Sequence, residues 1–291
     1  MSLQSLACVT TPCCPARFSM DELAGIETMS QWNPNDYHQH SSQQQKWARD
    51  ILDRLALTGQ EQILDIGCGD GKITAEVARH VPNGLVVGLD SSVEMIEFAR
   101  QSFPADTLPR LRFEQGDARQ LEFVEQFDWV ISFACLHWIL DHRPVLAGIH
   151  RALRPGGRLL LQFGGQGNAA EMVQVMSEVV ARPKWAGYFV GFAFPWRFYG
   201  PEDYRPLLQE AGLTATRLEL VPKDMTHEGP QGLEGWLRTT WMPYWHRVPA
   251  ELQQQFLDDI VASYLTVCPT DAEDRRIHLK MVRLEVEATK C

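Results

Sequence analysis

A glycine-rich loop follows the short apolar run at residues 63–66. Glycines at positions 67, 69 and 71 permit a tight turn there and let a ligand approach the backbone closely. A dinucleotide-binding loop of the form G-x-G-x-x-G would need a glycine at position 72, where Lys72 stands. Asp65, two residues before the first glycine, adds a negative charge that disfavours a pyrophosphate and suits a ligand with an ammonium group. The loop therefore predicts a binding turn for a ligand other than a dinucleotide.

Two further carboxylates follow the next two strand-like runs. Asp90 ends the run at residues 85–90, where a carboxylate can accept hydrogen bonds from both ribose hydroxyls of a nucleoside; capping the next helix is its alternative role. Asp117 follows the run at residues 111–115 and can accept a hydrogen bond from an adenine amine, or simply form a turn. Three carboxylates after three successive strands, with a glycine loop after the first, indicate a ligand with an ammonium group, a ribose and an adenine but no phosphate.

The elements that position these groups alternate between helix and strand from about residue 40 to residue 164. Ser91-Ser92-Val93-Glu94 has the S-x-x-E form of a capping box, with Ser91 as the cap, and predicts a helix directly after the second strand. The apolar runs predict strands at residues 62–66, 85–90, 111–115, 127–133 and 158–163. Such an alternation predicts a parallel sheet with helices on both faces, which binds its ligand at the carboxyl ends of the strands.

The pattern changes after the fifth predicted strand. Eight aromatic residues fall within residues 185–199. We predict two more strands at residues 216–221 and 279–287, separated by helical stretches at residues 233–245 and 249–265. These segments indicate a helical and aromatic cap that is inserted into the sheet.

The composition disfavours several classes of function. Lys and Arg number 27 against 37 Asp and Glu, a net charge of −10, and such an acidic chain is a poor candidate for binding phosphate backbones. No apolar run approaches the ~20 residues that a membrane-spanning helix needs. The seven cysteines form no C-x-x-C pair of the kind that zinc sites use. We therefore predict a cytoplasmic protein without a metal, a membrane anchor or a nucleic-acid partner.

Taken together, the motifs resemble those of the class I S-adenosylmethionine-dependent methyltransferases. Residues 64–71 are similar to the first motif of that family, residues 88–92 to the second, residues 115–118 to the third, and residues 153–157 to the turn before the fifth strand. The resemblance implies an α/β, Rossmann-like fold with a seven-stranded, mostly parallel sheet, helices on both faces and an antiparallel last strand at residues 277–288. It also implies that the chain is an enzyme whose cofactor is S-adenosylmethionine.

A narrower resemblance, to the trans-aconitate methyltransferases, covers much of the remaining chain. Residues 30–37, 136–139, 198–200, 210–212 and 235–238 carry it. Juvenile hormone acid methyltransferases share part of this pattern, including a glutamine near Gln43. The sequence departs from both families across the aromatic residues at 185–199, which affects the prediction of a substrate more than that of the cofactor.

This resemblance also implies a domain layout. If the family's start falls near Met29, residues 1–28 form a disordered extension and residues 29–291 form a single methyltransferase domain. Within that domain we predict a cofactor-binding core at residues 40–164. Residues 165–200 and 226–270 would be the cap insertions that bind the substrate.

The family's motifs assign cofactor contacts to the matching positions. Asp65 and the glycine loop would hold the methionine end, Asp90 the ribose, and Asp117 with Ala118 the adenine. Tyr37 and Gln43 would close over the cofactor. The complete predicted set is Tyr37, Gln43, Asp65, Gly67, Cys68, Gly69, Gly71, Asp90, Ser91, Met95, Asp117, Ala118 and Ala134.

Both families methylate small carboxylates, so the leading prediction is methyl transfer to a carboxylate oxygen of a small molecule, such as trans-aconitate or another small organic acid. An ionised carboxylate needs no general base, whereas a hydroxyl or amine acceptor more often does. A hydroxyl or amine on a small, partly apolar metabolite is therefore one alternative. A protein that binds S-adenosylmethionine without turnover is another. We expect a monomer or a homodimer.

His137 and Trp138, after the fourth strand, are the candidate catalytic residues. His137 would act as a base for a hydroxyl or amine, or would only line the pocket, and Trp138 would pack against the acceptor, against the sulfonium, or in the core. Arg238 would bind an acceptor carboxylate or form a surface salt bridge. The predicted substrate-binding residues are Trp32, Tyr199, Arg238 and Trp241.

We interpret the aromatic residues at 185–199 mainly as the core of the cap. If two or three of them face the pocket, the acceptor is bulkier and more apolar than aconitate.

Overall fold

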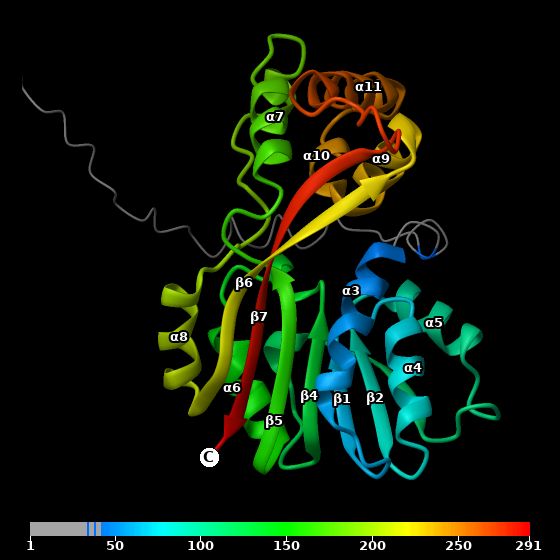
Figure 1. Ribbon diagram of the computed structural model, residues 1–291, viewed down its shortest axis with the longest axis vertical. Coiled ribbons are helices and arrows are strands. Elements are labelled where there is room, and N and C mark those ends of the chain that lie inside the picture. The colour runs from blue at the N-terminus through cyan, green and yellow to red at the C-terminus, as the bar shows by residue number, and fades with distance from the viewer. Residues whose placement is uncertain (1–33, 35–37, 39–41) are drawn as a thin grey trace, which may run out of the picture. The chain divides into compact units, whose positions relative to one another are not determined.

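The computed structural model describes Pro34, His38 and residues 42–291, which belong to one compact unit that spans residues 31–291 (Figure 1). The predicted extension at residues 1–28, together with Trp32 and Tyr37, lies outside the described residues. In chain order the elements are α3 (Ser42–Leu52), η1 (Asp53–Leu55), β1 (Gln62–Ile66), α4 (Lys72–His80), β2 (Leu85–Asp90), α5 (Val93–Ser102), β3 (Leu111–Gln115), η2 (Ala118–Gln120), β4 (Phe127–Phe133), η3 (Leu136–Trp138), α6 (Arg143–Ala152), β5 (Leu153–Gly164), α7 (Ala170–Val180), η4 (Ala186–Phe189), α8 (Pro201–Glu210), β6 (Leu213–His227), α9 (Gly229–Thr240), α10 (Met242–Trp245), α11 (Ala250–Val267) and β7 (Ile277–Lys290), where η marks a 3₁₀ helix.

The strands form a seven-stranded sheet with the order β3-β2-β1-β4-β5-β7-β6. Strands β1 to β5 run parallel, whereas β7 lies antiparallel between β5 and β6. Four of the five residues of β1 are buried, as expected for a central parallel strand that is covered on both faces. The prediction of a mostly parallel sheet with an antiparallel last strand is confirmed. Its parallel strands end at one edge, which is where the chemistry is expected.

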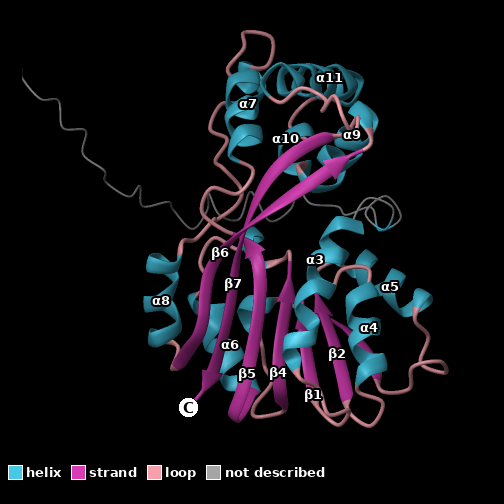
Figure 2. Cartoon of the chain, viewed as in Figure 1, coloured by secondary structure: helices cyan, strands magenta, loops and turns pink. Residues whose placement is uncertain are grey.

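Helices cover both faces of the sheet (Figure 2). On one face, Ile51 of α3, Val77 of α4 and Ile96 of α5 are buried in one cluster with residues of β1 and β2. On the other face, Leu146 of α6 and Tyr204 of α8 are buried in a second cluster. Each helix contributes one apolar stripe, because only one side of it faces the sheet.

A cap of helices surrounds the distal parts of β6 and β7, which extend beyond the other strands (Figure 1). Helices α9, α10 and α11 connect β6 to β7 along the chain, and with α7 they form a third buried cluster around Met225 and Leu279. Six of the eight aromatic residues at 185–199 belong to this cluster. Trp185 is fully buried there, and its indole N–H donates a hydrogen bond of 2.9 Å to Asp259. Most of this aromatic segment therefore forms the core of the cap.

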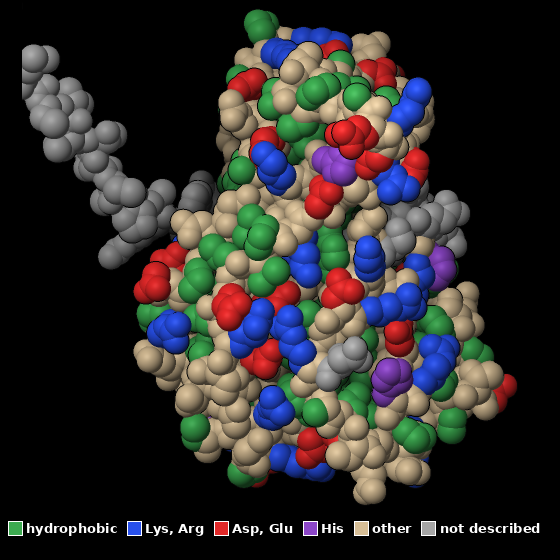
Figure 3. Space-filling view, viewed as in Figure 1, with side chains coloured by type: hydrophobic (Ala, Val, Ile, Leu, Met, Phe, Trp, Pro, Cys, Tyr) green, Lys and Arg blue, Asp and Glu red, His purple; other side chains and the backbone are tan. Residues whose placement is uncertain are grey.

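The last strand is unusual because it carries buried charges. Glu285 of β7 is 0% exposed and accepts hydrogen bonds from Arg54 (2.7 Å) and Gln162 (3.1 Å), with the guanidinium of Arg217 at 3.4 Å. These partners compensate the negative charge of Glu285, which allows its carboxylate to be buried in the sheet. On the surface, acidic and basic side chains are interspersed over the face that Figure 3 shows.

Three local predictions are wrong. Strand β6 runs from Leu213 to His227, beyond the predicted residues 216–221, because it pairs with β7 along this length. Helix α5 is capped by Ser92, whose hydroxyl accepts a hydrogen bond from the backbone N–H of Met95 (3.2 Å), and not by Ser91. Strand β5 begins at Leu153, ahead of the predicted start at residue 158, because Leu153 already pairs with Phe127 of β4. Within the described residues, no helix combines the length and the apolar character that crossing a membrane requires.

Candidate active site

The glycine loop between β1 and α4 has a backbone that requires glycine. Gly67, Gly69 and Gly71 have φ angles of +72°, +52° and +78°. The backbone N–H groups of Gly67 and Cys68 both donate to the carbonyl of Leu89, at 2.7 and 3.1 Å, so the loop is attached to the end of β2. A Cβ atom at position 67 would lie 2.2 Å from the Sγ atom of Cys135. The loop therefore lies directly against the segment that follows β4.

This close approach makes Gly67 the most sensitive position of the loop. Gly67→Ala is expected to weaken binding of S-adenosylhomocysteine by about 100-fold, because the left-handed backbone costs an alanine roughly 1–2 kcal/mol and the methyl group collides with Cys135 as well. Titration calorimetry checks this. Gly187→Ala is the matched control, since nothing lies within 4 Å of its added Cβ. Equal affinities for the two variants would contradict the assignment of this loop to the cofactor.

Asp90 positions the loop from the end of β2. Its carboxylate accepts hydrogen bonds of 2.9 Å from the backbone N–H groups of Gly69 and Ser92, and so connects the glycine loop to the start of α5. Burial raises the pKa of Asp90, and these backbone hydrogen bonds partly oppose the rise. The predicted role of Asp90 as a ribose ligand remains a proposal, and its position at the carboxyl edge is compatible with it.

Asp65 is a buried carboxylate with a single hydrogen bond described to its side chain. It is 2% exposed and accepts a hydrogen bond of 2.7 Å from the hydroxyl of Thr74. Burial raises the pKa of Asp65 to about 7; the bond from Thr74 opposes this rise and the charge of Asp90 adds to it. A carboxyl group of this kind is only partly ionised at neutral pH, and a cationic ligand would favour its ionised form.

Asp117 lies after β3, where it caps the 3₁₀ helix η2. It accepts hydrogen bonds from the backbone N–H of Arg119 (2.8 Å) and from the guanidinium of the same residue (2.6–3.0 Å). Burial alone would raise the pKa of Asp117, but the hydrogen bonds and charge of Arg119 outweigh it and lower the pKa. Asp117 is thus an ionised acceptor. Ala118 beside it is buried.

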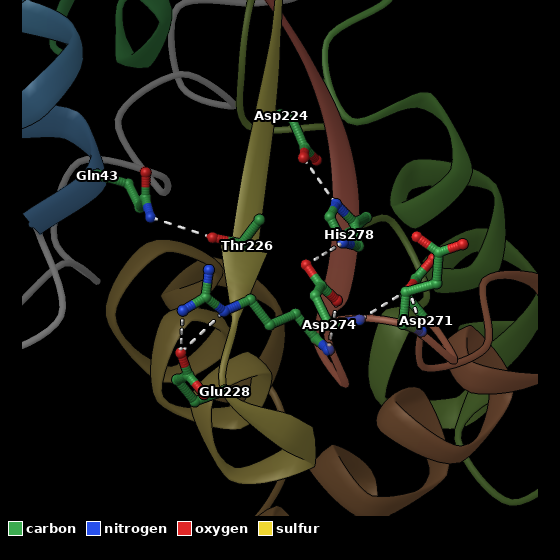
Figure 4. A network of polar contacts seen from close by, with 9 residues as sticks. Gln43, Asp224, Thr226, Glu228, Asp271, Asp274 and His278 are labelled. Carbon is green, nitrogen blue, oxygen red and sulfur yellow. Dashed lines mark hydrogen bonds and ion pairs between the residues drawn. The ribbon is translucent and has the colours of Figure 1, made fainter.

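The remaining predicted cofactor residues differ in their exposure, backbone conformation and hydrogen bonding. Ser91 is exposed and Met95 is 3% exposed. Ala134, after β4, has a φ of +54°, a conformation that non-glycine residues rarely adopt outside turns and functional sites. Figure 4 shows the side-chain amide of Gln43 directed at Thr226 of β6, to which it donates a hydrogen bond of 3.3 Å. The predicted contact of Gln43 with the cofactor remains a proposal.

The residues around the loop fit S-adenosylmethionine. Asp65 would hold the cationic amine, Asp90 the ribose and Asp117 the adenine amine, and the glycine loop would let the cofactor approach the backbone. Lys72 is engaged by the carboxylate of Asp70, at 3.3 Å, so the cation nearest the loop is already paired. In the described part of the chain, no group of three or more His, Cys, Asp and Glu side chains could hold a metal ion.

A cavity lies beside this site, between the carboxyl edge of the sheet and the cap. Ala134 lines this cavity and directly precedes Cys135, whose side chain lies against Gly67 of the glycine loop. Most of its wall is apolar and comes from five different parts of the chain. The large apolar side chains that line it are Trp138, Trp196, Phe198, Trp236, Trp241 and Met281.

Four polar side chains also line the cavity, namely His137, Asn168, Thr240 and Arg283. Arg283 of β7 is 4% exposed. Its guanidinium carbon lies 4.9 Å from the ring centre of Trp47 on α3, and one of its nitrogens donates to the side-chain oxygen of Asn168 at 3.4 Å. A planar guanidinium held in this way can bind a carboxylate through two N–H donors.

His137 lies in η3, close to Arg283. Burial lowers the pKa of His137 well below its usual value, and the positive charge of Arg283 lowers it further. The backbone N–H of Gly164 donates to its Nδ1 atom at 3.4 Å. The neutral ring therefore carries its proton on Nε2, where it is a hydrogen-bond donor and not a base.

The structure brings together only some of the predicted acceptor residues. His137, Trp138 and Trp241 line the cavity. Arg238 is not among the lining residues; its guanidinium pairs with Glu234, one turn earlier on α9, at 3.0 Å. Tyr199 is buried in the cluster under α6 and α8, and its hydroxyl donates to the carbonyl of Leu140 at 3.0 Å.

Sequence reasoning missed Arg283. A signal was present, because residues 277, 279, 281 and 283 occupy the buried phase of the last strand and only the fourth is charged. A charged residue at an inward-facing position is a candidate for function. Asn168 was also missed, and it carries no comparable pattern in the sequence.

The comparisons with known proteins agree with this geometry. Residues 63–157 match a family model described as a methyltransferase domain. The chain is 34% identical to a trans-aconitate 2-methyltransferase of Deinococcus radiodurans over 235 residues, which cover 78% of this chain and 87% of that protein. It is 32% identical to an uncharacterized methyltransferase of Schizosaccharomyces pombe over 223 residues, which cover 75% of this chain and 83% of the other.

Comparison of structures supports the same fold. The crystal structure of the YcgJ protein from Bacillus subtilis superposes with a TM-score of 0.59 at 16% identity, covering 84% of this chain and 97% of that one. The predicted enzyme class and cofactor are confirmed by the shared motifs, the family model and the relatives. The chain therefore belongs to the class I S-adenosylmethionine-dependent methyltransferases and, within them, resembles the trans-aconitate methyltransferases.

Proposed function

We propose that this methyltransferase forms a methyl ester on a carboxylate oxygen of a small molecule, which binds in the cavity under the cap. The observation that carries the proposal is the buried guanidinium of Arg283 among the aromatic walls of that cavity. In addition to its contacts within the protein, a guanidinium that lines a largely apolar cavity can bind a carboxylate through two N–H donors.

The position of the cavity supports transfer between the two sites. Ala134 lines the cavity, and the next residue, Cys135, contacts the glycine loop that we assign to the cofactor. An acceptor next to Ala134 would thus lie beside the methionine end of the cofactor. The carboxylates Asp65 and Asp90 lie on the cofactor side of this segment. Asp65 would therefore face the ammonium group of the cofactor, and Asp90 would face its ribose hydroxyls.

When bound, S-adenosylmethionine supplies a methyl group on a cationic sulfur that is already activated for displacement. The task of the chain's own residues is then to align the acceptor and to exclude water. Arg283 orients the carboxylate, and the Nε2–H group of His137 donates a hydrogen bond to one of its oxygens. Trp138 and Trp241 contribute apolar walls to the cavity. No residue has to remove a proton, because the acceptor is already ionised.

The lowered pKa of His137 and the hydrogen bond that its Nδ1 atom accepts from Gly164 favour a carboxylate over a hydroxyl or amine acceptor. A general base for those acceptors would need an unprotonated nitrogen directed at the substrate. The unprotonated nitrogen of His137 is Nδ1, which already accepts the hydrogen bond from Gly164. This argument supports ester formation as the reaction of this site.

The chemical stability of the product tests the proposal. The full chain is incubated with S-adenosylmethionine that is tritiated in its methyl group and with panels of carboxylic acids, alcohols and amines. We expect label only with acids, and mild base should release it as volatile methanol, since esters hydrolyse where ethers and methylamines do not. Base-stable label would replace the proposal with hydroxyl or amine methylation. Binding of S-adenosylhomocysteine without transfer to any panel would indicate a protein without turnover.

A further inference from the structure

Asn168 lines the cavity with a side-chain amide that has no part in the proposed function so far. It is 6% exposed. Its Oδ1 atom accepts hydrogen bonds from the backbone N–H of Val282, at 3.1 Å, and from the guanidinium of Arg283, at 3.4 Å. Among the described residues, none accepts a hydrogen bond from its Nδ2 atom. A buried donor group therefore borders the cavity without an acceptor from the described part of the chain.

The orientation of this amide is fixed by its two partners. A backbone N–H group can only donate, so the amide atom that faces Val282 must be the oxygen. The guanidinium of Arg283 is also only a donor and faces the same atom, so the two contacts agree. The other branch of the amide is therefore the nitrogen, which carries two N–H donors and cannot exchange places with the oxygen.

We propose that Asn168 is a specificity-determining residue whose Nδ2 atom donates a hydrogen bond to a second oxygen of the acceptor, in addition to the carboxylate that is methylated. This inference rests on the proposed function, because it describes a further part of the molecule whose carboxylate receives the methyl group. A buried donor that lacks an acceptor is unfavourable, and an oxygen of the bound molecule removes this cost. The ligand is thus a carboxylic acid with a carbonyl, ether or hydroxyl oxygen.

The methylated carboxylate has no lone pair left for Asn168. An ionised carboxylate has about four lone pairs, two on each oxygen. In the proposed function, the guanidinium of Arg283 donates to two of them and the Nε2–H group of His137 donates to a third. The remaining lone pair must stay free to attack the methyl group. A further donor in the same cavity therefore requires a different oxygen.

This second oxygen lies close to the carboxylate. The Oδ1 and Nδ2 atoms of Asn168 share one carbon, and Oδ1 lies 3.4 Å from the guanidinium of Arg283, so Nδ2 is near the group that binds the carboxylate. A Cβ atom at Gly164 would lie 3.0 Å from Nδ2, and the N–H of Gly164 donates to His137. Nδ2 is thus near both residues that we assign to the carboxylate. We expect the second oxygen on the carbon next to the carboxylate or on the one after it.

Matched sets of acids test the second oxygen. The full chain is assayed with saturating S-adenosylmethionine and with butanoate, octanoate and 3-phenylpropanoate, each compared with its 2-oxo and 3-methoxy derivatives. A ketone or ether oxygen accepts hydrogen bonds but cannot donate one, so it responds to a donor such as Nδ2. We expect kcat/KM for at least one derivative to exceed that for its parent acid by about tenfold or more, because a site that binds a substrate oxygen discriminates against the analogue that lacks it.

Two variants assign this preference to Asn168. Asn168→Asp keeps an oxygen for Val282 and Arg283 but lacks the N–H donors, and Asn168→Ala lacks both. In each variant the ratio of kcat/KM for the derivative to that for its parent should fall to about one or below. The ratio is taken within one variant, so a change in Arg283 or in the amount of folded protein affects both acids alike and cancels.

Thr240→Val is the matched control, because Thr240 is another neutral polar residue of the cavity wall. Its hydroxyl already donates to the carbonyl of Trp236 at 2.6 Å, so it has no donor for the acceptor. The ratio of the two kcat/KM values should stay within about twofold of that of the wild-type protein.

The outcomes separate this inference from the proposed function. Equal kcat/KM for parents and derivatives in the wild-type protein, or a preference that persists in both Asn168 variants, would overturn the inference and leave the proposed function intact. Affinity for S-adenosylhomocysteine that falls more than about fivefold in Asn168→Ala, measured by titration calorimetry, would assign Asn168 to the cofactor instead. Absence of transfer to all these acids and to the other acids of the panel would overturn the proposed function, and the inference with it.

Discussion

Replacing Arg283 by glutamine is expected to lower kcat/KM for a carboxylate acceptor by about 100-fold or more, while the affinity for S-adenosylhomocysteine changes little. Loss of one partner of a buried, hydrogen-bonded charge pair typically costs 2–5 kcal/mol, roughly a 30- to 5,000-fold change. Arg283 is 4% exposed and lines the cavity, so water would not replace the hydrogen bonds that the guanidinium donates to the carboxylate. Steady-state kinetics on the acid and calorimetric titration with S-adenosylhomocysteine measure the two quantities separately.

Arg238→Gln is the informative comparison. Arg238 lies in α9 of the cap, where it pairs with Glu234 at 3.0 Å. It is not among the residues that line the cavity. Arg283→Lys should restore little activity, because an ammonium cannot reproduce the planar, two-pronged contact of a guanidinium. If Arg238→Gln loses the activity and Arg283→Gln retains it, Arg238 is the carboxylate-binding residue and our assignment fails.

Asp65→Ala is expected to weaken binding of S-adenosylhomocysteine by about 100-fold, because it removes the buried carboxylate that we assign to the ammonium group of the ligand. Asp65 is 2% exposed, and its described hydrogen-bond partner is the neutral hydroxyl of Thr74. No other residue described within hydrogen-bond reach of it is charged, so the ligand's cation would be its first ionic partner. Titration calorimetry gives the affinity directly, and an unchanged value would remove Asp65 from the cofactor site.

The pH dependence of binding provides an independent signature of Asp65. In the free protein the pKa of Asp65 is raised to about 7, mainly by burial. A cationic ligand requires the ionised carboxylate, so its binding must displace a proton when the pH is below that pKa. The affinity of the wild-type protein should therefore fall as the pH decreases below about 7, approaching tenfold per pH unit. Asp65→Asn should bind weakly and without this dependence, whereas a persistent dependence would assign the titration to Asp90.

The cofactor-binding half of the site could be predicted from the sequence, because its main part is one continuous segment of the chain. β1, the glycine loop and the start of α4 form one continuous strand–turn–helix, and the positive φ of Gly67 imposes a residue type that is visible without a structure. Asp65 lies one residue before the end of β1 and Asp90 ends β2, so the general rule for parallel sheets already brings them to one edge. The periodicity of the helices likewise follows from the burial of one face.

The acceptor half depended on contacts between distant residues. Arg283 meets Asn168, 115 residues away, because β7 lies antiparallel beside β5 and pairs Arg283 with Gly164 at the carboxyl end of β5. The choice between Arg238 and Arg283 could not be made from residue types, since both are arginines. Glu234 stands one helical turn before Arg238 and pairs with it, which removes that cation from the cavity. The local sequence determines the backbone conformation and which face of each helix or strand is buried. Which charged side chain faces a cavity depends on the strand order and on the pairing of side chains, and only the folded chain brings these together.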